Sequence, residues 1–302
     1  MTGASMSAVE QAEPGPEAAL ARPADRPDRS PAARRRRRVR ALTYLAAVLL
    51  SLFVLVPIYL ISVTAFTPRE ISYDFPKPFI PGTVSAETVR FFADSTGVTA
   101  ALWRSVVVAA LTLVLSTLLG APAGYALARY AFRGKSTYRL LILSTRAFPI
   151  VILSIPLAVT FITWGIYDTT YSVALMHTGL ALPFTILITS SIFVSVPRDL
   201  EEAARTLGCT PLGAFVKVVL PIALPGLAAA AIFTFVLSWN EVFAAVILTL
   251  RQRTLPALVL AALNTSPLPF RFAAAWFMLA PSLVVIFVIR RYLLGLWGRV
   301  AR

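Results

Sequence analysis

The chain has little charge and almost none of the side chains that carry metal, redox or acid–base chemistry. Of its 302 residues only 14% are charged, whereas a soluble domain has about 25%. Its single cysteine, Cys209, excludes an intrachain disulfide. Its single histidine, His177, cannot make a metal site or a catalytic dyad by itself, and we expect it to be a hydrogen-bonded histidine near the membrane interface. The sequence therefore predicts no metal site, no cofactor and no catalytic residues.

Two further motifs are missing. The sequence has no Walker P-loop, the glycine-rich turn that cradles nucleotide phosphates. It also has no series of acids and histidines within its apolar segments that would suit a proton relay, because Glu241 is the only acid deep in such a segment. An ATP-hydrolysing enzyme, another membrane enzyme and an ion-coupled secondary transporter are therefore disfavoured.

Long uncharged, apolar stretches make up most of the chain. Hydrophobic residues account for 58% of it, and the mean hydropathy is +0.77. A helix needs about 20 apolar residues to cross the hydrocarbon core, and backbone groups in lipid must be bonded within the segment. We therefore expect an all-α integral membrane protein, with a six-helix membrane domain over 41–302. The expected spans lie near 41–65, 105–128, 143–164, 173–196, 226–249 and 272–290.

The distribution of basic residues predicts the orientation of these spans. Six spans place both termini on one side of the membrane. The segments on that side carry 20 lysines and arginines, against 7 on the other side. Since basic loops stay in the cytoplasm, we expect both termini to be cytoplasmic, in the cell membrane.

The first 40 residues differ from the rest in composition. They are rich in proline, alanine, arginine and acids, with almost no large apolar side chains, so we expect a disordered basic tail. Its arginine run, Arg34 to Arg38, adjoins the first span. We interpret this run as a topology signal that attracts anionic lipid headgroups, and we expect no nucleic acid partner.

A polar loop over 198–221 separates the fourth and fifth spans. Asp199 and Glu202 together resemble a capping box at the start of a short helix. Gly208 suits the left-handed residue that ends a helix, and Thr210-Pro211 suits the start of a second one. We expect the chain to break again at Pro221 and at Pro225-Gly226 before the fifth span. By these signals alone, the loop is either a simple connector or a surface built to contact a partner in water.

The same loop resembles the "EAA" loop of ABC importer permeases. The likeness rests on Glu202-Ala203-Ala204, on Gly208, and on Leu220-Pro221 at matching spacing, while Leu207 stands where the family usually has aspartate. Ala121 to Arg129 also resembles the end of the second span in permeases of the maltose type, and Ser238 to Glu241 resembles their fifth span.

The resemblance implies the fold and the partners of the chain. It implies a type I ABC importer permease fold with a shared core at about 100–292, and transport of a sugar or polyol. It also implies a second, homologous permease subunit, an ABC ATPase dimer and an extracytoplasmic solute-binding protein as partners, in addition to membrane lipid. The residues that it assigns to ATPase coupling are Glu201, Glu202, Ala203, Ala204, Gly208 and Pro221. A permease for an amino acid, a peptide or phosphate is the alternative, because such permeases share the loop.

Three neighbouring residues suggest a solute pathway in the fifth span. Glu241 lies nine residues before the expected outer end of that span, about 14 Å deep at 1.5 Å per residue. An ionisable group at that depth is costly and usually faces a cavity or a partner. With Trp239 and Asn240 beside it, Glu241 suits a neutral, hydroxyl-rich solute. The alternative is that Asn240 and Glu241 hold helices together or form a gate.

Overall fold

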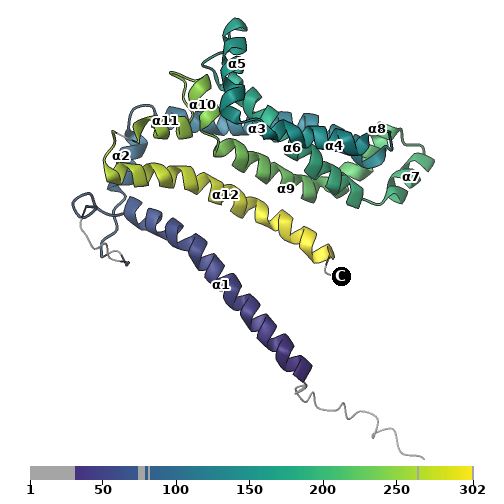
Figure 1. The fold of residues 1–302 in the computed structure, drawn as a ribbon, viewed down its shortest axis with the longest axis horizontal. Coiled ribbons are helices and arrows are strands. Elements are labelled where there is room, and N and C mark those ends of the chain that lie inside the picture. Colours follow the sequence, from purple (N-terminus) through teal and green to yellow (C-terminus); the bar gives the residue numbers. More distant parts are fainter. Residues whose placement is uncertain (1–30, 74–78, 81, 264, 301–302) are drawn as a thin grey trace, which may run out of the picture. The chain divides into compact units, whose positions relative to one another are not determined.

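The computed structural model describes residues 31–73, 79–80, 82–263 and 265–300, and helices dominate this part of the chain (Figure 1). No strand occurs within these ranges. The chain divides into two units, 1–57 and 58–302. The helices after α1 (Pro31–Ala65) are α2 (Glu87–Asp94), α3 (Val98–Arg129), α4 (Lys135–Ser144), the 3₁₀ turn η2 (Thr145–Ala147), α5 (Ile150–Thr163), α6 (Thr170–Ser195), α7 (Arg198–Thr206), α8 (Pro211–Ala214), the π-helical turn η3 (Phe215–Val219), α9 (Leu220–Trp239), α10 (Phe243–Leu248), α11 (Leu255–Ala262) and α12 (Leu268–Val300).

Most of the expected spans are present as helices. Five helical stretches among the described residues are long and apolar enough to cross a membrane: 35–65, 98–129, 170–195, 211–239 and 268–288. A sixth is counted if the bent pair 135–147 and 150–163 forms one span. The expectation for 31–40 was wrong, because α1 begins at Pro31 and its arginine run is helical. Proline suits the first helical position and arginine is a good helix former. Residues 1–30 of the expected tail lie outside the described residues.

The expected third span is not one straight helix. The chain bends by 86° between Ala147 and Ile150. Pro149 causes the break, because proline disfavours a helical conformation of the preceding residue. Phe148 is accordingly extended, with φ −75° and ψ 125°. The segment therefore consists of α4 with η2 on one side of the bend and α5 on the other.

The expected fifth span is displaced along the sequence. The predicted breaks at Pro221 and Pro225-Gly226 are wrong, because the helical stretch runs from Pro211 to Trp239 through both prolines. The π-helical turn η3 ends at Val219, shortly before Pro221, and such local widening is one way in which a membrane helix accommodates proline. The real break comes at 240–242, after which α10 forms a separate short helix.

Helices α3 and α6 pack closely along their length. Glycines in α3 permit this approach: a Cβ at Gly120 would lie 2.7 Å from the Thr185 side chain, and one at Gly124 would lie 2.1 Å from Thr189 Oγ1. The Thr189 hydroxyl donates a hydrogen bond to the Gly120 carbonyl across the contact. Small residues thus let the two helices approach closely.

Asp168 holds two connecting segments together. Its carboxylate accepts hydrogen bonds from the backbone N–H groups of Leu250, Arg251 and Gln252 at 2.8–3.0 Å. Its φ is +57°, a conformation rare for residues other than glycine. Partial burial raises the pKa of Asp168, but the three backbone donors and the Arg251 charge outweigh it, so its pKa lies below the usual value.

Candidate functional site

The polar loop between α6 and α9 has the helix–stop–helix form expected from its sequence. The N–H groups of Gly208 and Cys209 donate to the carbonyls of Arg205 and Ala204, both at 3.0 Å, and Gly208 has φ +91°. This is the Schellman arrangement, in which a left-handed residue ends a helix. The Thr210 hydroxyl then accepts a hydrogen bond from Gly213 N at 3.1 Å and begins α8. Gly208 and Thr210 are thus confirmed in their expected local roles.

One local expectation for this loop was wrong. Asp199 is not the cap of α7, because the helix begins at Arg198 and the cap residue, Pro197, offers no side-chain hydrogen bond. Asp199 and Glu201 lie instead in the first turn and Arg205 lies in the last. This distribution matches the helix dipole, which favours acids at the N-terminus and bases at the C-terminus.

The residues assigned to coupling have different surroundings. Glu202, Ala203 and Gly208 are exposed, whereas Ala204 is the buried residue of α7. Pro221 is exposed and lies within the helical stretch 211–239. Leu207 protrudes with 87% of its surface exposed. The exposed members can contact a partner, and the Ala204 side chain packs α7 against the rest of the chain.

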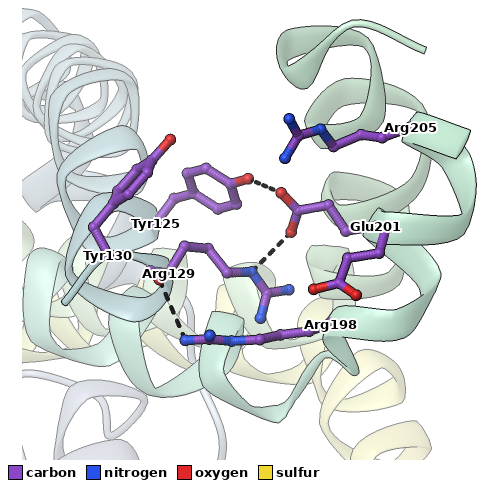
Figure 2. Close-up of a pocket in the computed structure, with 7 residues that line it drawn as sticks. Tyr125, Arg129, Tyr130, Arg198, Glu201 and Arg205 are labelled. Atoms are coloured by element: carbon purple, nitrogen blue, oxygen red, sulfur yellow. Dashed lines mark hydrogen bonds and ion pairs between the residues drawn. The ribbon is translucent and has the colours of Figure 1, made fainter. Parts of the chain in front are cut away.

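Glu201 faces the interior of the molecule, toward the end of α3 (Figure 2). Its Oε2 lies 2.9 Å from Arg129 Nε, and its Oε1 accepts a short hydrogen bond from the Tyr125 hydroxyl. The side chains of Arg129 and Glu201 are 7% and 14% exposed. Removal of either side chain would leave the other charge buried without a counter-charge, which destabilises the folded protein.

Two arginines extend this contact to the backbone. Arg129 Nη1 donates to the Val196 carbonyl at 3.1 Å. Arg198 Nη2 donates to the Arg129 carbonyl at 3.2 Å (Figure 2). Arg129 of α3 thus bonds a carbonyl of the connection between α6 and α7, and Arg198 of α7 bonds a carbonyl at the end of α3. The sequence contained a signal for this cluster, because Tyr125 and Arg129 lie four residues apart on one face of a helix. It gave no indication that their partner is Glu201.

The three residues of the expected solute pathway do not share one environment. Trp239 is 1% exposed, and its indole N–H donates to the Met278 carbonyl at 2.8 Å. It packs in the core and is not accessible to a solute within this chain. Asn240 is exposed, and its amide nitrogen donates to the Val236 carbonyl at 2.9 Å. Of the three residues, Asn240 is the one with an accessible side chain.

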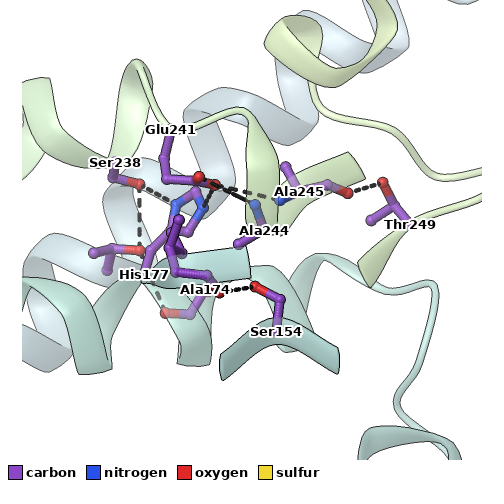
Figure 3. Close-up of polar contacts among 10 residues, drawn as sticks. Ser154, Ala174, His177, Ser238, Glu241, Ala244, Ala245 and Thr249 are labelled. Carbon is purple, nitrogen blue, oxygen red and sulfur yellow. Dashed lines mark hydrogen bonds and ion pairs between the residues drawn. The ribbon is translucent and has the colours of Figure 1, made fainter. Parts of the chain in front are cut away.

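Glu241 is held in a buried polar network at the break between α9 and α10 (Figure 3). Its carboxylate accepts hydrogen bonds from the N–H groups of Ala244 and Ala245 at 3.1 and 3.3 Å. His177 Nε2 lies 3.0 Å from Glu241 Oε2, and His177 Nδ1 lies 2.9 Å from the Ser238 hydroxyl. Glu241 therefore caps α10 and joins it to α6. Sequence reasoning anticipated a hydrogen-bonded His177 but not its partners, Ser238 and Glu241.

The described residues contain no group of three or more histidine, cysteine or acidic side chains placed to hold a metal ion. The candidate sites are thus an exposed loop surface tied to α3 and a polar network at a helix break. His177 contacts the Ser238 hydroxyl in the polar network, but these side chains are 1% and 4% exposed, so this base and hydroxyl are buried between packed helices.

Comparison with known proteins identifies relatives of the chain. A family model described as "binding-protein-dependent transport system inner membrane component" matches residues 116–295. The trehalose transport system permease protein SugB of Mycobacterium tuberculosis is 35% identical over 221 residues, covering 70% of this chain and 80% of SugB. The diacetylchitobiose uptake system permease protein NgcG of Streptomyces coelicolor is 32% identical over 214 residues, 68% of each chain.

Other relatives show how far the similarity extends. The molybdate/tungstate transport system permease protein WtpB of Thermococcus kodakarensis is 35% identical over 195 residues, covering 65% of this chain and 78% of WtpB. A chain of a bacterial ABC transporter that imports the acidic polysaccharide alginate has the same fold, with a TM-score of 0.65 at 21% identity. That match covers 84% of this chain and 96% of the other.

Proposed function

This chain belongs to the family of binding-protein-dependent transport system inner membrane components, and we propose that it is the permease subunit of an ATP-driven importer of a sugar or polyol. It is a transport subunit of a membrane complex rather than an enzyme, and a separate ATPase subunit hydrolyses the ATP. The observation that carries the proposal is the exposed α7 surface, a polar, capped helix set between two membrane-spanning helices.

The exposed loop residues support a docking role toward the ATPase. Glu202 and Ala203 lie on the accessible face of α7, and Gly208 sets the turn that follows. A small side chain at residue 203 lets a partner surface approach closely. The proposed assembly is this subunit with a second, homologous permease, an ATPase dimer bound at the loop, and an extracytoplasmic solute-binding protein. Both termini and the loop would lie on the cytoplasmic side, in keeping with the excess of basic residues there.

A carbohydrate is the better supported solute. Two relatives are named for trehalose and diacetylchitobiose, but the molybdate/tungstate permease has comparable identity, so overall identity does not by itself decide the substrate. The exposed amide of Asn240 at the helix break suits a neutral, hydroxyl-rich solute. Glu241 would act beside it by fixing the break, as a gate or support for the pathway.

A transport assay tests this function. Cells that express the complete complex should accumulate a labelled disaccharide, and uptake should persist when a proton uncoupler is added while ATP is maintained. Abolition of uptake by the uncoupler at constant ATP would indicate ion-coupled transport instead. Labelled molybdate serves as the matched alternative solute. Its uptake in place of every sugar or polyol tested would refute the carbohydrate assignment while leaving the permease assignment intact.

A further inference from the structure

Two adjacent glutamates of α7 face in different directions. Glu201 is 14% exposed and lies against α3, whereas Glu202 is exposed. Successive residues of an α-helix are rotated by about 100°, so both side chains cannot contact the same surface. They therefore serve different contacts, although they are identical in type and adjacent in sequence.

The contact between α7 and α3 is mainly polar. Ala204 is the only buried residue of α7, so the helix has little apolar surface that anchors it. Its polar contacts with α3 are the ion pair between Glu201 and Arg129, the hydrogen bond from Tyr125, and the bonds from Arg198 to the Ala128 and Arg129 carbonyls. The position of α7 relative to α3 thus depends on a few directional bonds around one carboxylate.

The α3 side of this contact is rigid. The Tyr125 ring packs against Phe193 of α6 and Phe215 of η3, with ring centroids 5.6 and 4.6 Å apart. These rings fix the position of the hydroxyl that binds Glu201. Because α3 and α6 are also in close contact at Gly124, a displacement of the end of α3 reaches the helices packed against it.

We propose that Tyr125, Arg129 and Glu201 form a latch that transmits the movement of α7 to α3. The latch rests on the proposed function, because it presumes an ATPase that moves α7. Glu202 faces the ATPase and receives the movement. Glu201 is a positioning residue that acts inside the subunit and passes the movement on to the membrane helices.

The latch predicts a specific defect in the reconstituted complex of both permeases, the ATPase and the binding protein. In Glu201→Gln and Arg129→Gln, the ATPase should still copurify and hydrolyse ATP, but uptake should fall. The number of ATP molecules hydrolysed per solute should rise on the order of tenfold, the worth of one charge-assisted hydrogen bond. The matched control, Glu202→Gln, should instead lower the amount of ATPase that copurifies.

A charge swap separates a transmitting contact from a merely structural one. Glu201→Arg combined with Arg129→Glu restores opposite charges and should bring the ratio of ATP to solute back toward that of the unmodified complex. The latch would be overturned if the single variants hydrolyse as much ATP per solute as the unmodified complex. It would also be overturned if the charge swap does not lower the ratio of ATP to solute below that of the single variants.

Tyr125→Phe decides the matter if the glutamine variants do not assemble, since it keeps the ring packing and removes only the hydroxyl. A several-fold rise in the number of ATP molecules hydrolysed per solute supports the latch, and an unchanged number overturns it. An unmodified complex without ATP-driven uptake would refute the proposed function and the latch together. A normal complex with unchanged variants refutes the latch alone.

Discussion

The contact between α3 and α6 at Gly124 allows a quantitative test of the packing. In Gly124→Ala, the new Cβ would lie 2.1 Å from Thr189 Oγ1 and 2.9 Å from both Ile186 O and Ser190 N. Two of these atoms belong to the backbone. The third is held by the hydrogen bonds of the Thr189 hydroxyl to the carbonyls of Gly120 and Thr185 at 3.2 and 2.7 Å. The helices must therefore separate.

The expected loss of stability follows from two opposing terms. Forcing one extra methyl group into a tight contact costs about 1–3 kcal/mol. The better helix propensity of alanine offsets up to about 1 kcal/mol of this. Because the contact of 2.1 Å is severe, the cost lies in the upper part of this range and the net loss is about 1–2 kcal/mol. At about 2–4 °C per kcal/mol, this loss lowers by about 2–8 °C the temperature at which half the protein remains monodisperse in detergent.

A matched substitution controls for the change in residue type. Gly179 lies in α6 with nothing within 4 Å of an added Cβ. Gly179→Ala should therefore leave the midpoint unchanged or raise it slightly. Thr189→Ala in the Gly124→Ala background should cost less than the sum of the two single changes, because it removes the nearest clash. If Gly124→Ala behaves like Gly179→Ala, the helices are not packed as closely as described.

Four other outcomes are expected. Gly208→Ala should weaken ATPase copurification, because alanine is strained by about 1 kcal/mol or more at φ +91°; normal copurification and transport would make the loop a simple connector. Asn240→Ala should reduce uptake several-fold or alter the accepted solutes, with assembly intact; normal uptake of the same solutes would remove Asn240 from the pathway. A cysteine at Asp94 should react with an impermeant thiol reagent in intact cells and one at Ser136 should not, as the basic-residue count predicts; the reverse pattern would invert the orientation. The contribution of Asp168 to stability should be present above about pH 4 and be lost as pH falls through its lowered folded pKa, so the detergent midpoint should fall less steeply between about pH 6 and pH 3 in Asp168→Asn; equal slopes would show that the carboxylate is not needed.

Local rules predicted the parts of the structure that depend on neighbouring residues. The sequence predicted the left-handed glycine at 208 and the Thr210-Pro211 helix start, because a cap is satisfied within three or four residues. It also predicted the fourth span to within about three residues, since length and apolar character set a membrane helix. These features need no knowledge of the rest of the chain.

Proline was a less reliable guide, because its effect depends on the neighbouring turns of the helix. Pro149 lies at a break, as the N-cap of α5, whereas Pro225 lies inside a helix. A π-helical turn precedes Pro221, and the pattern of neighbouring residues does not predict where such a turn forms. The same residue type thus produced a break at Phe148-Pro149 and no break at Pro225.

The sequence did not predict which side chains pair when they are far apart along the chain. Glu201 is separated from Tyr125 by 76 residues, and Glu241 is separated from His177 by 64. The depth of Glu241 in its span predicted a cavity or a partner for it but not which one, and no pattern predicted that Glu201 pairs within the chain. His177 is 1% exposed and bonds both Ser238 and Glu241, a pairing that the sequence did not predict.

The identity of that partner changes what Glu241 does. A carboxylate that bonds His177 and also accepts the N–H groups of Ala244 and Ala245 has little capacity left for a solute hydroxyl. It is well suited to stabilise the break at 240–242, where the helix leaves backbone N–H groups without partners. The break in turn exposes the Asn240 side chain. The polar site at this helix break therefore combines two kinds of residue. Glu241 is a buried acid that stabilises the break, and Asn240 is an exposed amide that can contact the solute.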